Sequence, residues 1–214
     1  MKVHETNDPG CRCKSTINLA GFLARSSVNG PGIRPVVWVQ GCPIHCEGCF
    51  NPQFLSFNLG QQVTPSSLAE IICAQKNIDG ATFSGGEPFT QAHALGDLGE
   101  QLREQGHSIV TFTGFSPDIV LKSTRPAWKR LVAATDLLIA GPYISSMKCN
   151  DPWIGSSNQR IIPLTDTITL PASSTHASGH PAEFTVHPDG TLTATGFPDR
   201  QFVKGLTHRC RGDS

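Results

Sequence analysis

Three cysteines that could bind iron lie close together in the first quarter of the chain. They are Cys42, Cys46 and Cys49, in the run from Gln40 to Asn51. Iron–sulfur clusters normally bind Cys thiolates through a short loop that wraps the cube. Three thiolates in eight residues can therefore hold three corners of the cube and leave the fourth iron open to a substrate or cofactor. The spacing indicates cluster chemistry rather than electron storage alone.

Two other interpretations of this triplet stay open. Cysteines at i, i+4 and i+7 share one face of a helix, where they would be small buried apolar groups. Pro43, with Gly41 and Gly48 on either side, argues against a helix here. The other alternative is a zinc site with His45 as the fourth ligand. Structural zinc usually draws its ligands from two separated pairs, and no second pair at that spacing follows.

A second motif, Ser84-Gly85-Gly86-Glu87-Pro88, follows a short apolar run about forty residues after the cysteine loop. Its two glycines allow the backbone to approach a ligand closely, and its proline stiffens the exit. The carboxylate and the main-chain carbonyls can accept hydrogen bonds from an ammonium group. Alone, the motif is typical of a tight turn. Its pairing with the cysteine loop indicates an amine-binding site beside a cluster.

Together these segments resemble the radical S-adenosylmethionine enzymes, and among them the small activating enzymes of glycyl-radical proteins. The group that activates anaerobic ribonucleotide reductase is the most similar. Further segments resemble that group, from a lead-in before the cysteine loop to a C-terminal hairpin: Val28–Arg34, Glu47–Asn51, Asp136–Tyr143, Gly155–Arg160 and Thr191–Arg200. The resemblance runs from about Ile17 to Phe202. One departure is Ala140, which stands where many activating enzymes carry an acidic residue.

The resemblance implies a role for each motif. Cys42, Cys46 and Cys49 would be the catalytic cysteines that bind a [4Fe-4S] cluster, whose open iron takes the amino and carboxylate groups of S-adenosylmethionine. Other contacts to S-adenosylmethionine are expected from Phe50, Asn51, Ser84, Gly85, Gly86, Glu87, Thr113 and Gly114. An electron from reduced flavodoxin or ferredoxin would cleave S-adenosylmethionine to a 5′-deoxyadenosyl radical. That radical would take a hydrogen atom from a glycine of a partner glycyl-radical enzyme.

Two other functions remain open at this point. The first is a radical S-adenosylmethionine enzyme that modifies a small molecule or a peptide natural product. Its cofactor site would be the same, and the residues around the entrance to that site would differ. The second is a non-catalytic iron–sulfur or zinc module. A passive module has no use for Glu87 and the glycine pair, so binding of S-adenosylmethionine discriminates against it.

Composition bears on the partners and the cellular compartment of the protein. The 17 Lys and Arg residues equal the 17 Asp and Glu residues, so nothing indicates a nucleic-acid surface. The sequence has no run of membrane-spanning length and no signal-peptide core, and we expect a cytoplasmic protein. Eight cysteines in that compartment should be reduced. Cys73 is expected to be buried, and Cys149 lies in a loop that could approach the site. The roles of Cys11, Cys13 and Cys210 stay unassigned.

The order of elements predicts an α/β fold. Apolar runs predict strands, amphipathic runs predict helices, and their alternation is typical of a parallel sheet with crossover helices. Strands are expected at 35–40, 81–84, 108–113 and 136–140, and helices from 64, at 92–104 and between 117 and 133. The resemblance implies a partial (β/α)6-type barrel. After it, the runs 184–186 and 192–195 predict a C-terminal β-hairpin that turns at Asp189-Gly190. One domain is expected at 17–205, between a polar leader (1–16) and a polar tail (206–214).

Overall fold

The computed structural model describes residues 15–170, 181–186 and 192–197. The polar tail, the expected Asp-Gly turn and all but two residues of the polar leader lie outside these ranges. So do Cys11, Cys13 and Cys210, whose roles therefore stay open.

The centre of the fold is a seven-stranded mixed sheet in the order β3-β1-β2-β4-β5-β6-β7. Its strands are β1 (Ile17–Ser26), β2 (Arg34–Val39), β3 (Gln61–Val63), β4 (Gly80–Gly85), β5 (Ser108–Thr113), β6 (Leu137–Ala140) and β7 (Arg160–Pro163). The strands β2, β4, β5 and β6 are parallel, and they are the four that the sequence predicts. The other three pair antiparallel. Within the described residues β3 and β7 are edges, so the parallel-rich α/β sheet is confirmed but closure into a barrel is not shown.

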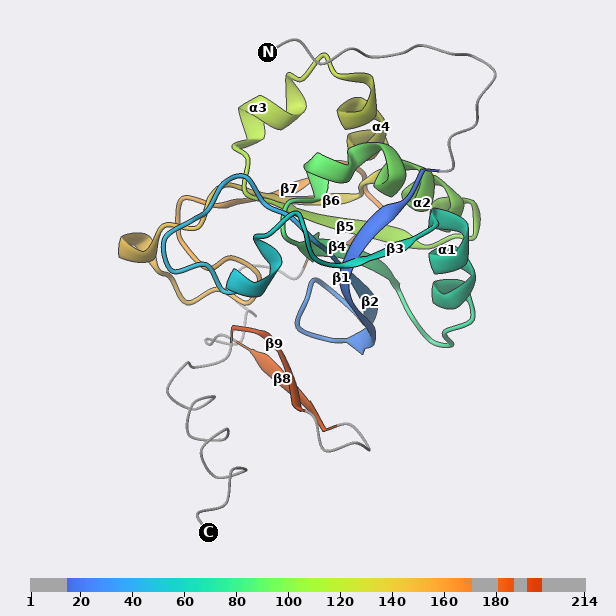
Figure 1. Ribbon diagram of the computed structural model, residues 1–214, viewed down its shortest axis with the longest axis horizontal. Helices are drawn as coiled ribbons and strands as arrows, with labels where there is room; N and C mark the ends of the chain where they lie inside the picture. Colours follow the sequence, from blue (N-terminus) through green and yellow to red (C-terminus); the bar gives the residue numbers. More distant parts are fainter. Residues whose placement is uncertain (1–14, 171–180, 187–191, 198–214) are drawn as a thin grey trace.

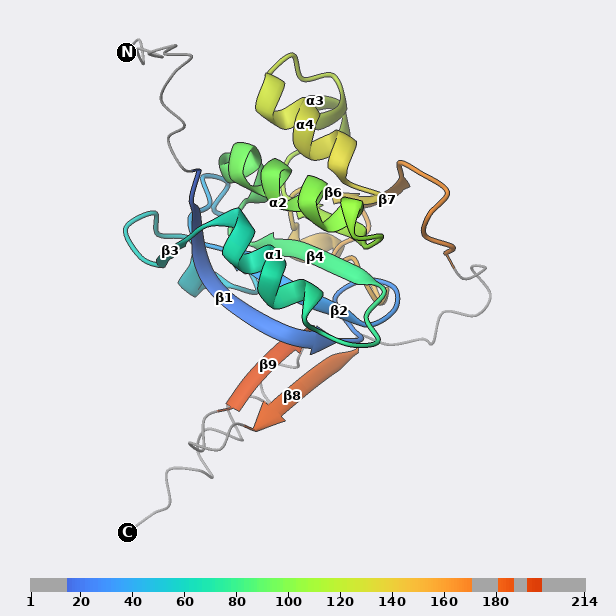
Figure 2. The same ribbon diagram turned by 90° about the vertical axis from the view of Figure 1, so that its right-hand side faces the viewer.

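Helices cover one face of this sheet (Figures 1 and 2). They are α1 (Pro65–Cys73), α2 (Ala92–Glu104), α3 (Pro117–Leu121) and α4 (Pro126–Ala134), with short 3-10 turns η1 (Pro52–Phe54), η2 (Pro88–Gln91) and η3 (Ser145–Met147). Thr64 begins α1 as its N-cap, because its side chain accepts a hydrogen bond from the Ser67 N–H and Pro65 needs no partner at the first position. The bounds of α1, α2, α3 and α4 show that the predicted helices are present.

The main core lies between the sheet and α1, α2 and α4. Its fully buried side chains come from alternate strand positions and from one stripe of each helix, including Phe83, Ile109, Leu138, Leu95 and Leu98. A smaller apolar cluster of Val110, Leu137, Ile139 and Trp153 lies on the other sheet face. Cys73 is exposed at the end of α1, so the prediction that it is buried is wrong. The apolar stripe of α1 ends one residue earlier, at Ile72.

A C-terminal hairpin stands on the sheet face opposite the helices (Figure 2). Its strands β8 (Ala182–Val186) and β9 (Leu192–Gly196) pair antiparallel with each other, as predicted. The hairpin forms a sheet of its own, separate from the seven-stranded sheet. In the described part of the chain, no helix has the length and apolar character needed to cross a bilayer.

Candidate functional site

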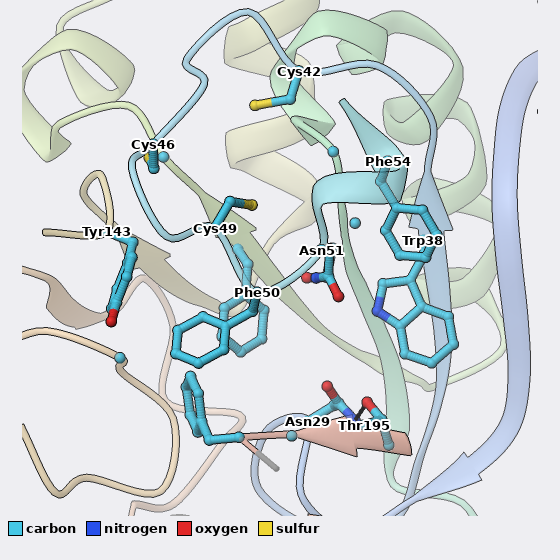
Figure 3. Close-up of a pocket in the computed structure, with 18 of the residues that line it drawn as sticks. Asn29, Trp38, Cys42, Cys46, Cys49, Phe50, Asn51, Phe54, Tyr143 and Thr195 are labelled. Atoms are coloured by element: carbon cyan, nitrogen blue, oxygen red, sulfur yellow. Dashed lines mark hydrogen bonds between the residues drawn. The ribbon is translucent and has the colours of Figure 1, made fainter. Parts of the chain in front are cut away.

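A pocket of about 660 Å³ opens at the carboxyl ends of β2, β4 and β5 and extends along the sheet face opposite the helices. That volume is typical of sites for cofactors and other small molecules. All eleven residues singled out from the sequence line it: Cys42, Cys46, Cys49, Phe50, Asn51, Ser84, Gly85, Gly86, Glu87, Thr113 and Gly114. In Figure 3 the three cysteines lie at one end, and Asn29 and Thr195 at the other. The carboxyl ends of parallel strands meet at one sheet edge, which explains this convergence.

The cysteine loop leaves β2 and is held at both ends by backbone hydrogen bonds. The N–H groups of Gly41 and Cys42 donate to the carbonyls of Phe54 and Leu55, at 2.9 and 3.1 Å. Cys49 N–H donates to Cys46 O at 3.2 Å and closes a turn. The backbone of Gly41 has φ of +95°, in the left-handed region, and a Cβ there would lie 2.4 Å from the Phe57 ring. These contacts define the path of the loop.

The Gly-Gly-Glu segment packs directly on this loop. The Gly86 N–H donates to Val39 O at 2.7 Å, and the Glu87 N–H donates to Gly41 O at 2.9 Å. A Cβ on Gly86 would lie 2.3 Å from Gly41 O and 2.9 Å from Phe54 O. Only glycine therefore allows the two loops to approach this closely. The contact aligns the main chain of both loops along one wall of the pocket.

The Glu87 carboxylate is fully buried and accepts three hydrogen bonds. Its Oε1 accepts from Phe89 N–H at 2.9 Å and from the Thr113 hydroxyl at 2.8 Å. Its Oε2 accepts from Gly114 N–H at 2.8 Å. Burial raises the pKa of Glu87 to about 7, although these three donors act to lower it. The carboxylate thus ties the exit of β4 to the exit of β5, a link between predicted residues that the motifs did not reveal.

Burial also raises the pKa of the thiols of Cys42 and Cys46 above the ordinary value. Backbone N–H groups oppose this rise, those of Ile44 and His45 at Cys42 and that of Tyr143 at Cys46. Within the described ranges no three His, Cys, Asp or Glu side chains are grouped closely enough to hold one metal ion. A [4Fe-4S] cube takes each thiolate on a different iron, so its ligands need not converge on a point. The five described cysteines are free thiols.

Sequence reasoning missed most of the remaining pocket wall. Phe50 makes edge contacts with the rings of Tyr143 and Phe197, whose centroids are 4.8 and 5.0 Å away. Trp38 lines the opposite side of the pocket, and its ring centroid lies 6.4 Å from that of Phe54. The signal for Trp38 is the alternation along β2, where Val37 and Val39 face the helices and Trp38 faces the other way.

Ser156 and Asn158, from the segment Gly155–Arg160 that resembles the family, lie outside the pocket lining, and so does Cys149. Ser156 is buried, and its hydroxyl accepts a hydrogen bond from Ile144 N–H at 3.1 Å. Asn158 donates to Pro142 O, and the Cys149 thiol donates to Ile154 O at 3.7 Å. These contacts shape the turn between β6 and β7. Gln159 in the same turn reaches the pocket while bonded to Gly141 O and to the N–H groups of residues 155 and 156.

Known proteins are similar to this chain over the region that contains these motifs. A family model described as "4Fe-4S single cluster domain" matches residues 28–162, which include the cysteine loop and the Gly-Gly-Glu segment. The anaerobic ribonucleoside-triphosphate reductase-activating protein of Enterobacteria phage T4 is 31% identical over 147 residues, covering 66% of this chain and 90% of the relative. The chain belongs to the radical S-adenosylmethionine family of activating enzymes.

Other members of the activating-enzyme family are similar over different lengths. The reductase-activating protein of Escherichia coli K12 is 31% identical over 143 residues, covering 62% of this chain and 89% of the relative. The pyruvate formate-lyase-activating enzyme of Clostridium pasteurianum is 36% identical over 94 residues, covering 41% of this chain and 40% of the relative. The family model ends at residue 162. It therefore includes the strands β2 to β6 and the motif loops, but neither β1 nor the β8–β9 hairpin.

Proposed function

We propose that this chain is an activating enzyme that cleaves S-adenosylmethionine reductively at a [4Fe-4S] cluster and generates a glycyl radical on a partner enzyme. One observation carries the proposal: the three thiols of one loop and the Gly-Gly-Glu segment line the same pocket. The printed names of the relatives agree, since they activate anaerobic ribonucleotide reductase or pyruvate formate-lyase.

The residues present fit these two cofactors. Three free thiols on one short loop supply the donor set of a site-differentiated cluster. At Gly86 the main chain of the Gly-Gly-Glu segment lies directly against the cysteine loop, in the space that a Cβ would occupy. When bound, the cluster supplies the electron that cleaves S-adenosylmethionine to the 5′-deoxyadenosyl radical. Cys42, Cys46 and Cys49 would hold the cluster.

The chain's own residues orient the cofactor and exclude water. A carboxylate offers about four acceptor positions, and Glu87 uses three of them inside the protein. The remaining position, with the carbonyls of Ser84 to Gly86, would hold the amino group. Phe50 and Asn51 lie on the same wall as Cys49 and would contact the adenine. The aromatic contacts of Phe50 restrict its ring and keep that side of the pocket apolar.

The proposal includes three finer statements. The open sheet would be part of a partial barrel whose inner face is the pocket. The electron would come from reduced flavodoxin or ferredoxin, and the protein would work in the cytoplasm, where free thiols such as those described here persist. The single domain would run from residue 17 to residue 205.

The test is anaerobic reconstitution with iron and sulfide, followed by reduction with dithionite and an assay for 5′-deoxyadenosine. We expect one [4Fe-4S] cluster per chain and formation of 5′-deoxyadenosine in the wild type. Cys46→Ala should lose both. Cys149→Ala is the matched control, because it removes a described free thiol outside the pocket lining and should keep both.

Two results would contradict the proposal. A fully loaded, reduced wild type that forms no 5′-deoxyadenosine would identify a passive iron–sulfur module. Equal iron content in Cys46→Ala and the wild type would show that the cluster lies elsewhere. A glycyl-radical signal in electron paramagnetic resonance, on a candidate partner enzyme mixed with the reduced protein, then distinguishes an activating enzyme from one that acts on a small molecule.

A further inference from the structure

The β8–β9 hairpin is a wall of the pocket that the cofactor chemistry does not explain. Residues 192 to 197 line the pocket, and Thr195 lies at the end away from the cysteines (Figure 3). Among the described residues, the hairpin has no strand pairing with the seven-stranded sheet. The described contacts between the hairpin and the rest of the chain involve its side chains.

Three hydrogen bonds join the hairpin to the end of β1. The Glu183 carboxylate accepts three hydrogen bonds, from the Ser26 hydroxyl at 2.6 Å, the Ser27 N–H at 2.8 Å and the Ser27 hydroxyl at 2.7 Å. Partial burial acts to raise the pKa of Glu183, but these donors outweigh it and hold the pKa below the usual value. The carboxylate is therefore ionised at neutral pH, which strengthens all three bonds.

Two further contacts come from β9 and the residue after it. Asn29 donates from Nδ2 to the Thr195 hydroxyl at 2.8 Å (Figure 3). The Phe197 ring meets the edge of Phe50, the residue that follows the last cysteine of the loop. Phe197 thus meets the residue that follows the cysteine loop.

Little apolar surface holds the hairpin down. No residue of β8 is buried, and Phe184, Val186 and Leu192 are 38, 73 and 39% exposed. Elements with few buried apolar contacts open locally at a small fraction of the cost of global unfolding. The core strands β4 and β5, whose side chains are mostly buried, lie at the other extreme.

We propose that the β8–β9 hairpin is a detachable wall, latched by Glu183 on Ser26 and Ser27, whose release admits an extended polypeptide segment of a protein partner to the pocket. The inference rests on the proposed function for its partner, because a glycine within a protein backbone must reach the cofactor with its flanking chain. S-adenosylmethionine itself is small and needs no such release. Release separates Phe197 from Phe50, whereas Tyr143 keeps its own contact with the Phe50 ring.

The test is hydrogen–deuterium exchange, read by mass spectrometry on the cofactor-free full chain. In the wild type we expect the amides of β8 and β9 to exchange faster than those of β4 and β5. Glu183→Ala should speed exchange in β8 and β9 by about tenfold to a hundredfold and leave β4 and β5 unchanged, because it removes only hydrogen bonds of the latch. Glu183→Gln keeps an acceptor oxygen for Ser27 and should give an intermediate increase. Glu70→Ala, on the exposed face of α1, is the matched control and should change nothing.

Three outcomes would overturn the proposal. The first is exchange in β8 and β9 as slow as in β4 and β5. The second is a Glu183→Ala variant that matches Glu70→Ala. The third is faster exchange throughout the sheet of Glu183→Ala, which would make Glu183 a general stabiliser of the fold.

Reconstituted Glu183→Ala should also form 5′-deoxyadenosine at the wild-type rate without a partner. Loss of that activity in Glu183→Ala alone would contradict a role limited to the wall. Its absence in the wild type would instead reject the proposed function, and the exchange result would still decide whether the wall detaches.

Discussion

Gly86→Ala tests whether the contact between the two motif loops shapes the pocket. The added Cβ would lie 2.3, 2.7 and 2.9 Å from Gly41 O, Gly41 C and Phe54 O. All three are backbone atoms, so no flexible side chain can move aside. Overpacking of this kind costs about 1–3 kcal/mol. Separating the loops also breaks the bond from Glu87 N–H to Gly41 O, which adds about 1 kcal/mol. We expect the free energy of unfolding to fall by about 2–4 kcal/mol.

Urea unfolding of the cofactor-free chain measures this loss, and titration of the reconstituted protein measures affinity for S-adenosylmethionine. Affinity should fall by about tenfold or more, because the loop that would hold the amine moves away from the loop that would hold the cluster. Gly96→Ala is the matched control. A Cβ there meets the flexible side chain of Arg130 at 3.3 Å, and alanine favours the helix by up to about 1 kcal/mol. A Gly86→Ala protein within about 0.5 kcal/mol of the wild type, with unchanged affinity, would refute the reasoning.

Three further predictions concern buried groups. Burial raises the pKa of Glu87 from 4.5 to about 7, so its contribution to stability is complete below pH 4.5 and is lost as the pH rises through 7. At about 1.4 kcal/mol per pKa unit, the free energy of unfolding of the wild type should fall by about 3 kcal/mol over this range relative to that of Glu87→Gln. Urea unfolding without cofactors measures this difference. If the free energies of unfolding of the two proteins change in parallel with pH, the prediction is contradicted. Leu98→Ala should cost about 2–5 kcal/mol, because its fully buried side chain leaves a cavity, whereas the exposed Ile119→Ala should stay within about 0.5 kcal/mol. Arg34→Met should cost about 2–6 kcal/mol in the same assay, because it leaves the buried Ser108 carbonyl and hydroxyl without their donor, at about 1–3 kcal/mol for each acceptor. A loss below about 1 kcal/mol would show that water replaces the guanidinium.

The sequence predicted the parallel part of the sheet because those strands are short apolar runs that end in turn residues. β5 and α2 have the predicted bounds. The edge strands β3 and β7 carry no such signal. β3 is three residues long with two exposed glutamines, and no residue of β7 is buried. They become strands through pairing with β1 and β6, which a local pattern does not encode.

The candidate site also has a part that the sequence predicts and a part that it does not. The cysteine loop and the Gly-Gly-Glu segment are contiguous motifs whose chemistry is visible in the residue types. The bonds from Thr113 and Gly114 to Glu87 depend on the register of β4 against β5. The far wall depends on contacts between Ser26, Ser27 and Glu183, more than 150 residues apart. No spacing rule predicts such pairs.

The two edge strands have a consequence for the protein before it acquires a cofactor. A freshly made chain must persist with an empty pocket, and exposed sheet edges are then templates for pairing between molecules. Here β3 offers only three residues, and β7 carries an exposed Arg160 at one end and Pro163, which has no N–H to donate, at the other. In the described part of the chain, both edges of the seven-stranded sheet are therefore poor templates. The borders of this sheet disfavour pairing between molecules that have not yet bound iron.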